Sequence, residues 1–206
     1  MNAPPTPARV YGVLPAAGLS RRMGRPKQSL RYGDSTMAGQ VARTMLATTN
    51  AVVVVTRSEL ITAMDLPQDE RLHIAYNDDP QTQMMDSIRI GIDRLHDELS
   101  RVTGSATDVG ILVIPADMPT VPVNVCHRCI GIFQNDPTRI VIAVHNGRRG
   151  HPIIFPYGLR QTLDEIEGGL NTLPKCRADL VQDVEINDPA ILRDINTQED
   201  YSRLGS

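Results

Sequence analysis

Four short runs of the chain are apolar at nearly every position, and they constrain the fold more than any other feature. They cover residues 10–14, 51–55, 109–114 and 139–144. A strand with one solvated face alternates apolar and polar residues, so strands without alternation are buried on both faces, as in a parallel sheet covered by helices. The runs therefore predict an α/β fold with three layers, in which helices cover both faces of a mostly parallel central sheet.

The segments between these runs carry helical patterns. A helix is predicted over residues 35–47, with Ser35 or Thr36 as its N-cap. A longer helix has one apolar face formed by Met84, Ile88, Ile92, Leu95 and Leu99. Further helices are predicted over residues 60–65, 122–133 and 157–166, and further strands over residues 72–76, 153–155 and 180–184. Thr197 and Asp200 predict a capping box at the start of a closing helix.

Size and charge narrow the class of protein. A chain of 206 residues suits one α/β domain, predicted over residues 10–206, after a proline-containing flexible lead over residues 1–9. A net charge of -3 gives no general attraction to nucleic acid or to an anionic membrane. No apolar run approaches the ~20 residues of a membrane-spanning helix. We therefore expect a cytoplasmic protein that acts on small molecules.

Two of the three cysteines, Cys126 and Cys129, have the two-residue spacing of redox and zinc motifs. They lie inside the predicted helix over residues 122–133, and no second Cys/His pair completes a tetrahedral zinc site. We expect buried thiols that serve packing.

The stretch after the first apolar run combines small residues with cations. A strand that ends in Ala16, Ala17 and Gly18 has little side-chain bulk, so a ligand can approach its backbone. Four cations follow within seven residues, namely Arg21, Arg22, Arg25 and Lys27. A flat neutral group beside the small residues and a polyanion beside the cations would match a nucleoside triphosphate.

Two other phosphate-binding loops are excluded at this place. The Walker A pattern requires Gly-Lys-Ser/Thr, and the dinucleotide fingerprint requires three closely spaced glycines. Neither pattern is present. The alternative that stays open is a solvated basic turn between a strand and a helix.

Asp117 is the only carboxylate between residues 109 and 136, and it lies just past the end of a predicted central strand. Ligands of open α/β sheets gather at the carboxyl edge of the strands. This position favours a functional role, whereas an aspartate in a turn otherwise serves as a local cap.

The loop over residues 14–27, Leu-Pro-Ala-Ala-Gly-x-Ser-x-Arg-Met-Gly-x-Pro-Lys, resembles the signature of the molybdopterin nucleotidyltransferase family. Residues 77–91 resemble the second motif of that family, and the Asp-x-Pro of residues 117–119 matches its metal motif. Residues 147–152 match Gly-x-Arg-Gly-His-Pro, and residues 194–200 resemble its closing segment. The resemblance covers nearly the whole chain and implies a Rossmann-like nucleotidyltransferase fold.

The resemblance also implies roles for individual residues. Arg22 and Lys27 would contact the phosphates, and Asp117 would hold Mg²⁺, so these three would be the catalytic residues. Asp194 is a tentative second metal contact, with helix capping as its alternative. The nucleotide would lie against Leu14, Pro15, Ala16, Ala17, Gly18, Asn77 and Ser87. The acceptor side would be formed by Arg149, Gly150, His151 and Pro152.

The implied reaction transfers a nucleoside monophosphate to the phosphate of molybdopterin or molybdenum cofactor and releases pyrophosphate. Ala17 stands where guanylyl-transferring members tend to have Gly, which favours CTP over GTP. The resemblance also implies a transient contact with an enzyme that accepts the finished cofactor.

Two alternatives stay open. Pro15 and the sequence Pro-Lys-Gln over residues 26–28 also resemble the methylerythritol phosphate cytidylyltransferases, which act on a polyol phosphate. Those enzymes carry a His-Asp-Ala-x-Arg-Pro sequence that is absent here. A non-catalytic nucleotide-binding relative is the other alternative, because four positions depart from the family pattern, namely Pro15, Gln83, Asn196 and Gln198.

Overall fold

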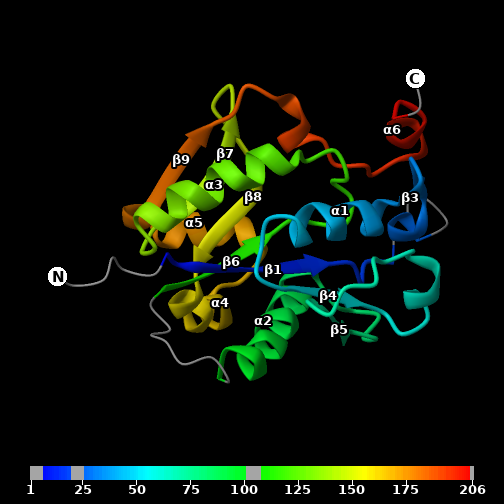
Figure 1. Cartoon of the computed structure of the whole chain (residues 1–206), viewed down its shortest axis with the longest axis horizontal. Coiled ribbons are helices and arrows are strands. Elements are labelled where there is room, and N and C mark those ends of the chain that lie inside the picture. Colours follow the sequence, from blue (N-terminus) through cyan, green and yellow to red (C-terminus); the bar gives the residue numbers. More distant parts are fainter. Residues whose placement is uncertain (1–6, 20–25, 101–107, 205–206) are drawn as a thin grey trace.

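The computed structural model describes residues 7–19, 26–100 and 108–204. Its centre is a seven-stranded sheet in the order β5-β4-β1-β6-β8-β7-β9 (Figure 1). The strands are β1 (Arg9–Pro15), β4 (Val52–Thr56), β5 (Leu72–Tyr76), β6 (Val109–Val113), β7 (Ile140–His145), β8 (Arg148–Pro156) and β9 (Val181–Glu185). Within this sheet, β8 is antiparallel to both of its neighbours, and the other neighbouring pairs are parallel. The prediction of a mostly parallel sheet is confirmed.

Helices cover both faces of the sheet. The α-helices are α1 (Met37–Leu46), α2 (Met84–Ser100), α3 (Val123–Asn135), α4 (Arg160–Glu165), α5 (Leu173–Cys176) and α6 (Gln198–Ser202). Residues of α1 and α3 share one hydrophobic cluster with one face of the sheet, and residues of α2, α4 and α5 share a second cluster with the other face. This arrangement confirms the expected three layers.

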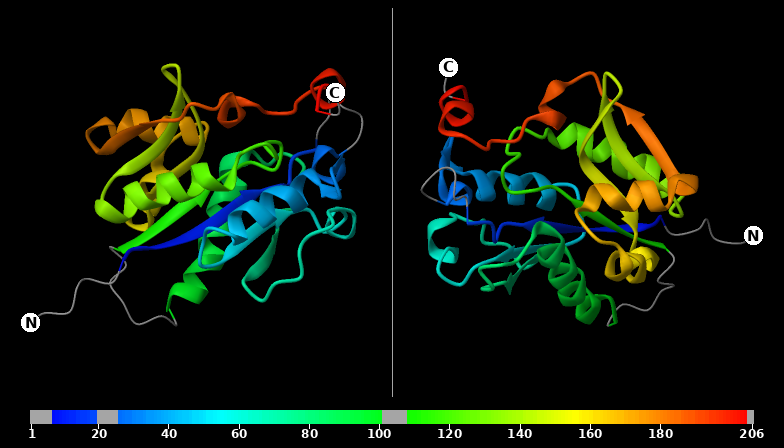
Figure 2. Two further views of the ribbon diagram at one scale, coloured as in Figure 1. Left: turned by 45° about the horizontal axis from the view of Figure 1, so that its top comes forward. Right: turned by 180° about the vertical axis from the view of Figure 1, so that it is seen from behind.

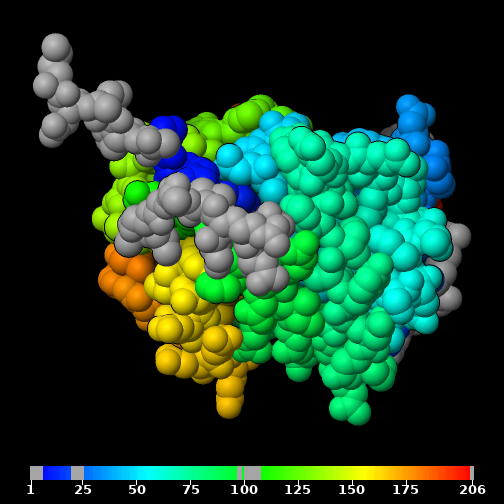
Figure 3. All heavy atoms as spheres, turned by 60° about the horizontal axis from the view of Figure 1, so that its bottom comes forward, coloured from blue at the N-terminus to red at the C-terminus, as the bar shows by residue number. Residues whose placement is uncertain are grey.

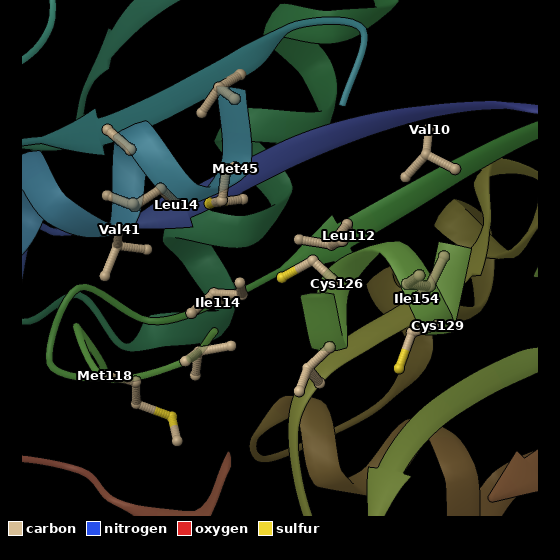
Figure 4. Close-up of a cluster of buried hydrophobic side chains, with 14 of the residues drawn as sticks. Val10, Leu14, Val41, Met45, Leu112, Ile114, Met118, Cys126, Cys129 and Ile154 are labelled. Carbon is tan, nitrogen blue, oxygen red and sulfur yellow. The ribbon is translucent and has the colours of Figure 1, made fainter. Parts of the chain in front are cut away.

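The first strand shows how its apolar run serves both layers. Val10 and Leu14 belong to the cluster under α1 and α3, whereas Tyr11 and Val13 belong to the cluster under α2. Figure 4 shows Val10 and Leu14 within the first cluster. Successive side chains of a strand point to opposite faces, so an unbroken apolar run is needed where both faces are covered.

The Cys-x-x-Cys pair lies in this same core. The side chains of Cys126 and Cys129 project from α3 into the first cluster, and both residues are fully buried (Figure 4). Burial raises the pKa of each thiol to about 12. Both cysteines therefore stay protonated near neutral pH and pack as small apolar groups, as expected.

The predicted capping residues mark the starts of α1 and α6 correctly. The Thr36 hydroxyl accepts a hydrogen bond from the Gly39 amide at 3.1 Å, which confirms Thr36 as the N-cap of α1. Thr197 and Asp200 form the predicted capping box of α6.

Some elements differ from the predictions. The helix expected over residues 60–65 is a short 3-10 turn at Ile61–Ala63, and the one expected over residues 157–166 divides into a 3-10 turn and α4. Two short elements had no periodic signal, namely the ribbon of β2 (Arg31–Tyr32) with β3 (Ser35–Thr36), and α5. Each is too short to show a period.

The predicted apolar face of α2 is wrong at its first position. Met84 is 47% exposed, and Met85 is buried in its place with Ile88 and Ile92. Met84 is the first residue of α2 and lines an open pocket, so the buried face starts one residue later.

The structure also bears on the expected N-terminal lead and on the possibility of a membrane-spanning helix. Ala8 is buried and Arg9 already belongs to β1, while residues 1–6 of the expected lead lie outside the described residues. Within the described part of the chain, no helix combines the length and apolar character needed to cross a bilayer.

The packing of α2 on the sheet depends on a glycine. A Cβ atom at Gly91 would lie 2.6 Å from a methyl carbon of Val13 and 3.1 Å from one of Val55. The helix therefore approaches β1 and β4 more closely than any larger residue permits.

A second contact joins α2 to α4. Arg89 of α2 donates to the Leu163 carbonyl oxygen of α4 from Nε at 3.1 Å and from Nη2 at 2.6 Å. Figure 3 shows the face of the molecule on which these two helices lie.

The same substitution should have opposite effects in two helices. Gly91→Ala should lower the free energy of unfolding by about 1–3 kcal/mol, because the added methyl group overpacks the core. Gly131→Ala in α3 should raise it by about 0.5–1 kcal/mol, since no atom lies within 4 Å of the new methyl group and alanine favours a helix. Urea unfolding of both variants tests this. Equal effects of the two changes would contradict the close approach at Gly91.

Candidate functional site

A pocket opens at the carboxyl ends of β1 and β6. These strands are parallel neighbours, so the segments that follow them leave the sheet at the same edge. The Ala116 amide donates to the Pro15 carbonyl oxygen at 3.3 Å, which holds the two exits together. The cavity, of about 140 Å³, is lined by Pro15, Ala16, Ala17, Gly18, Lys27, Gln28, Thr82, Gln83, Met84, Ser87, Pro115, Ala116 and Asp117.

The small residues form one wall of this pocket. Ala16 and Ala17 are each 2% exposed, and the Ala16 amide donates to the Val55 carbonyl oxygen at 2.7 Å. The Gln28 side chain donates from Nε2 to the carbonyl oxygens of Ala16 at 2.7 Å and Gly18 at 2.5 Å. The loop is thus held from inside by a glutamine that the sequence marked only as part of Pro-Lys-Gln, without a role in the site.

The charged centre of the pocket is an ion pair between residues 90 positions apart. Lys27 Nζ lies 2.5 Å from Asp117 Oδ2, and the two side chains are only 19% and 12% exposed. Lys27 Nζ also donates to Asn196 Oδ1 at 2.8 Å. Asn196 in turn donates from Nδ2 to Asp194. Three segments of the chain therefore meet at one ammonium group.

The C-terminal segment of the chain reaches the site because it packs against Leu30 and Met37. Ile195 is buried with Leu30 and Met37, and the Ile195 amide donates to the Asp117 carbonyl oxygen at 2.9 Å. The Tyr201 hydroxyl donates to the Arg31 carbonyl oxygen at 2.8 Å, so α6 lies beside the β2 and β3 ribbon (Figure 2). These contacts place Asn196 against Lys27. The sequence marked Asn196 only as a departure from the family pattern.

Oxygen ligands for a hard divalent cation gather here. Asp117 and Asn196 present a carboxylate and an amide oxygen to the Lys27 ammonium, and the Asp194 carboxylate binds the other end of the Asn196 amide. Such oxygens also suit Mg²⁺ when phosphate and water complete its shell. Among the described residues, no group of three or more His, Cys, Asp and Glu side chains forms a metal cage. Asp194 takes no part in the capping box of α6, which uses Thr197 and Asp200. The residues fit a cation that a polyphosphate helps to hold.

Two of the expected nucleotide contacts do not line the pocket. Leu14 is fully buried in the core, since it is an interior residue of β1 paired with Val54 of the next strand. Asn77 is 6% exposed and donates from Nδ2 to the hydroxyl oxygens of Thr82 at 2.6 Å and Ser87 at 3.2 Å. Asn77 therefore supports the start of α2, whereas Ser87 itself reaches the pocket.

The cations of the loop are only partly placed. Arg22, with Arg21 and Arg25, lies outside the described residues, so Lys27 is the member of that cationic group whose position the structure gives.

A second cavity, of about 260 Å³, lies along β7 and β8. It is lined by Ile142, Arg149, Gly150, His151, Ile153, Leu170, Asn171, Pro174 and Lys175. Three of the expected acceptor-side residues thus share one cavity, whereas Pro152 is buried beside it. Gly150 is required there because a Cβ atom would collide with the Ile191 carbonyl oxygen.

Charge in the second cavity is largely compensated. Arg149 forms a bidentate pair with Asp183, with nitrogen to oxygen distances of 2.9 and 3.0 Å. His151 Nδ1 lies 3.1 Å from the Val113 carbonyl oxygen. Burial lowers the pKa of His151, and the carboxylates of Asp117 and Asp194 partly oppose that shift. The His151 imidazole in the lining of the second cavity is therefore neutral near pH 7.

The sheet order and the pocket at the ends of β1 and β6 place the chain among α/β nucleotide-binding proteins. Comparison with known families is more specific, because residues 12–181 match the MobA-like NTP transferase domain. The chain belongs to this family.

Individual relatives span nearly the whole chain. Nicotine blue oxidoreductase of Paenarthrobacter nicotinovorans is 28% identical in an alignment of 207 positions that covers 95% of this chain and 96% of that protein. Molybdenum cofactor cytidylyltransferase of Escherichia coli strain K12 is 26% identical over 194 residues, 92% of each chain. The crystal structure of Rv0371c from Mycobacterium tuberculosis H37Rv superposes with a TM-score of 0.76 at 22% identity, covering 98% of this chain and 100% of that one.

The ion pair predicts strong coupling between two distant positions. Lys27→Met and Asp117→Asn should each destabilise the protein, and the double variant should lose less than the sum, with a coupling energy of about 0.5–3 kcal/mol. The exposed pair of Glu199 and Arg203, 74% and 71% exposed, is the matched control, and its coupling should be about 0.2–1 kcal/mol. Urea unfolding of both cycles gives the two energies. A smaller coupling for the buried pair than for the exposed pair would refute the contact.

Proposed function

We propose that this protein transfers a nucleoside monophosphate from its triphosphate to the phosphate of molybdopterin or molybdenum cofactor, with release of pyrophosphate. One observation carries the proposal: a lysine and an aspartate meet at a pocket whose other wall is a loop of small residues. The loop suits a nucleoside, and the ammonium group suits its phosphates. The E. coli relative bears the name of a molybdenum cofactor cytidylyltransferase, which supports the choice of acceptor.

The reaction needs little proton chemistry from the protein. A phosphate acceptor is already an anion near neutral pH, so no general base is required to activate it. The main barrier is repulsion between two anions and the charge that grows on the departing pyrophosphate. The Lys27 ammonium, with Arg22 from the same loop, would neutralise the triphosphate.

Asp117 would hold Mg²⁺, with Asp194 and Asn196 close enough to add oxygen ligands directly or through water. A bound Mg²⁺ supplies charge neutralisation at the phosphate oxygens. Lys27 would then exchange its bond to Asp117 for bonds to phosphate, so the ammonium stays paired in both states.

The acceptor would enter through the second cavity. Arg149, Gly150 and His151 line it, Pro152 is buried next to them in the chain, and His151 is close enough to Asp117 to feel its charge. A neutral imidazole there adds no charge that would hold the acceptor phosphate away from the reacting centre.

CTP is the favoured donor. Ala17 lies in the pocket wall where guanylyl-transferring members tend to have Gly, and the E. coli relative is named as a cytidylyltransferase. Binding constants for CTP and GTP measured side by side test this preference.

Two other activities are distinguished by one set of assays. A cytidylyl or uridylyl transferase for a sugar or polyol phosphate would release pyrophosphate without molybdenum cofactor. The relative from P. nicotinovorans is named as an oxidoreductase, so reduction of nicotine blue is a further assay. Pyrophosphate release that requires molybdenum cofactor supports the proposal, and release with only a polyol phosphate rejects it.

Substitution of the ion pair should abolish transfer. Lys27→Met and Asp117→Asn should each lower kcat/KM by about a hundredfold or more. The first removes the ammonium that would neutralise the triphosphate, and the second removes the carboxylate charge that would hold Mg²⁺. Initial rates of pyrophosphate release measure the loss, and circular dichroism checks that each variant is folded. Gln134→Met in α3, far from the pocket, is the control and should keep full activity. A folded Lys27 or Asp117 variant with wild-type rate would show that the roles are assigned wrongly.

A further inference from the structure

Gln28, like Ser87, is a buried polar side chain in the wall of the nucleotide pocket. It is 2% exposed, yet it lines the cavity beside Lys27 and the small-residue loop. A buried carboxamide costs free energy unless its donors are used. Its Nε2 donates to two carbonyl oxygens of the same loop, those of Ala16 and Gly18.

These two bonds determine where the loop lies. The carbonyl groups of Ala16 and Gly18 are two residues apart, and both are held toward one nitrogen atom at 2.7 and 2.5 Å. The backbone between them, with Ala17, must therefore curve around the amide. Ala17 lines the pocket, so this curve also sets the position of its side chain in the wall.

The neighbour of Gln28 in the chain is Lys27, which pairs with Asp117 and Asn196. One 3-10 turn, Lys27–Ser29, thus carries both the side chain that shapes the nucleoside wall and the side chain that meets the phosphates. The two halves of the pocket are joined through a single peptide bond.

We propose that Gln28 is a positioning residue for the nucleoside moiety of the substrate, acting through the loop of residues 16–18 and making no contact with the phosphates. The inference rests on the proposed function only in that the ligand is a nucleoside triphosphate. It predicts that loss of the Gln28 donors weakens recognition of the nucleoside and leaves polyphosphate binding intact.

The experiment compares CTP with inorganic tripolyphosphate, each with Mg²⁺, by calorimetry on the full chain. Gln28→Met keeps the length of the side chain and removes both donors. Gln28→Glu keeps the size and places a carboxylate against two carbonyl oxygens. Gln134→Met is the matched control, since Gln134 Nε2 also donates to a backbone carbonyl oxygen, that of Ala8 at 2.9 Å, away from the pocket.

Both Gln28 variants should lose about tenfold or more in affinity for CTP, while affinity for tripolyphosphate changes by less than about twofold. Gln134→Met should change neither. An equal loss for CTP and tripolyphosphate, no loss for either ligand, or unfolding of both Gln28 variants at the assay temperature would overturn the inference. In the last case Gln28 would be a structural residue.

The binding experiment on Gln28 and the transfer assay can fail independently of each other. If Gln28→Met weakens CTP binding selectively but the wild-type protein transfers nothing to molybdenum cofactor, the transferase is rejected and the inference is kept. If the protein has full transferase activity and Gln28→Met binds CTP as tightly as the wild type, the transferase proposal is kept and the inference is rejected.

Discussion

The ion pair between Lys27 and Asp117 is the contact on which the site depends. It joins the loop after β1 to the turn after β6, and through Asn196 it also binds the closing segment. The pair exists because β1 and β6 are parallel neighbours whose carboxyl ends meet at one edge of the sheet. With both side chains largely buried, removal of one charge leaves the other without its oppositely charged partner.

The rest of the pocket can be understood as support for this pair. The glycine at position 91 lets α2 approach β1, which brings the start of that helix, with Ser87, against the loop of small residues. Gln28 holds the same loop from inside. On the far side, Arg149 pairs with Asp183 and burial lowers the pKa of His151, so among the described residues the charges nearest the proposed phosphate site are those of Lys27 and Asp117.

The sequence predicted the parts of the fold that rest on local patterns. Unbroken apolar runs such as residues 51–55 identified the buried strands, and the cap at Thr36 identified the start of α1. The face of α2 was predicted one residue too early, because helical spacing alone does not show that Met84 borders an open pocket while Met85 packs in the core. Gln28 and Asn196 were not identified as site residues, since their roles depend on contacts with residues 12 and 169 positions away and on no spacing pattern.

The most direct test is a crystal structure of the protein with Mg²⁺ and a non-hydrolysable analogue of CTP. The account predicts that the triphosphate lies between Lys27 and Asp117, with the metal on the Asp117 carboxylate, the lysine on phosphate and the cytidine against residues 16–18. A nucleotide bound elsewhere, with the Lys27 to Asp117 pair unchanged, would contradict the account.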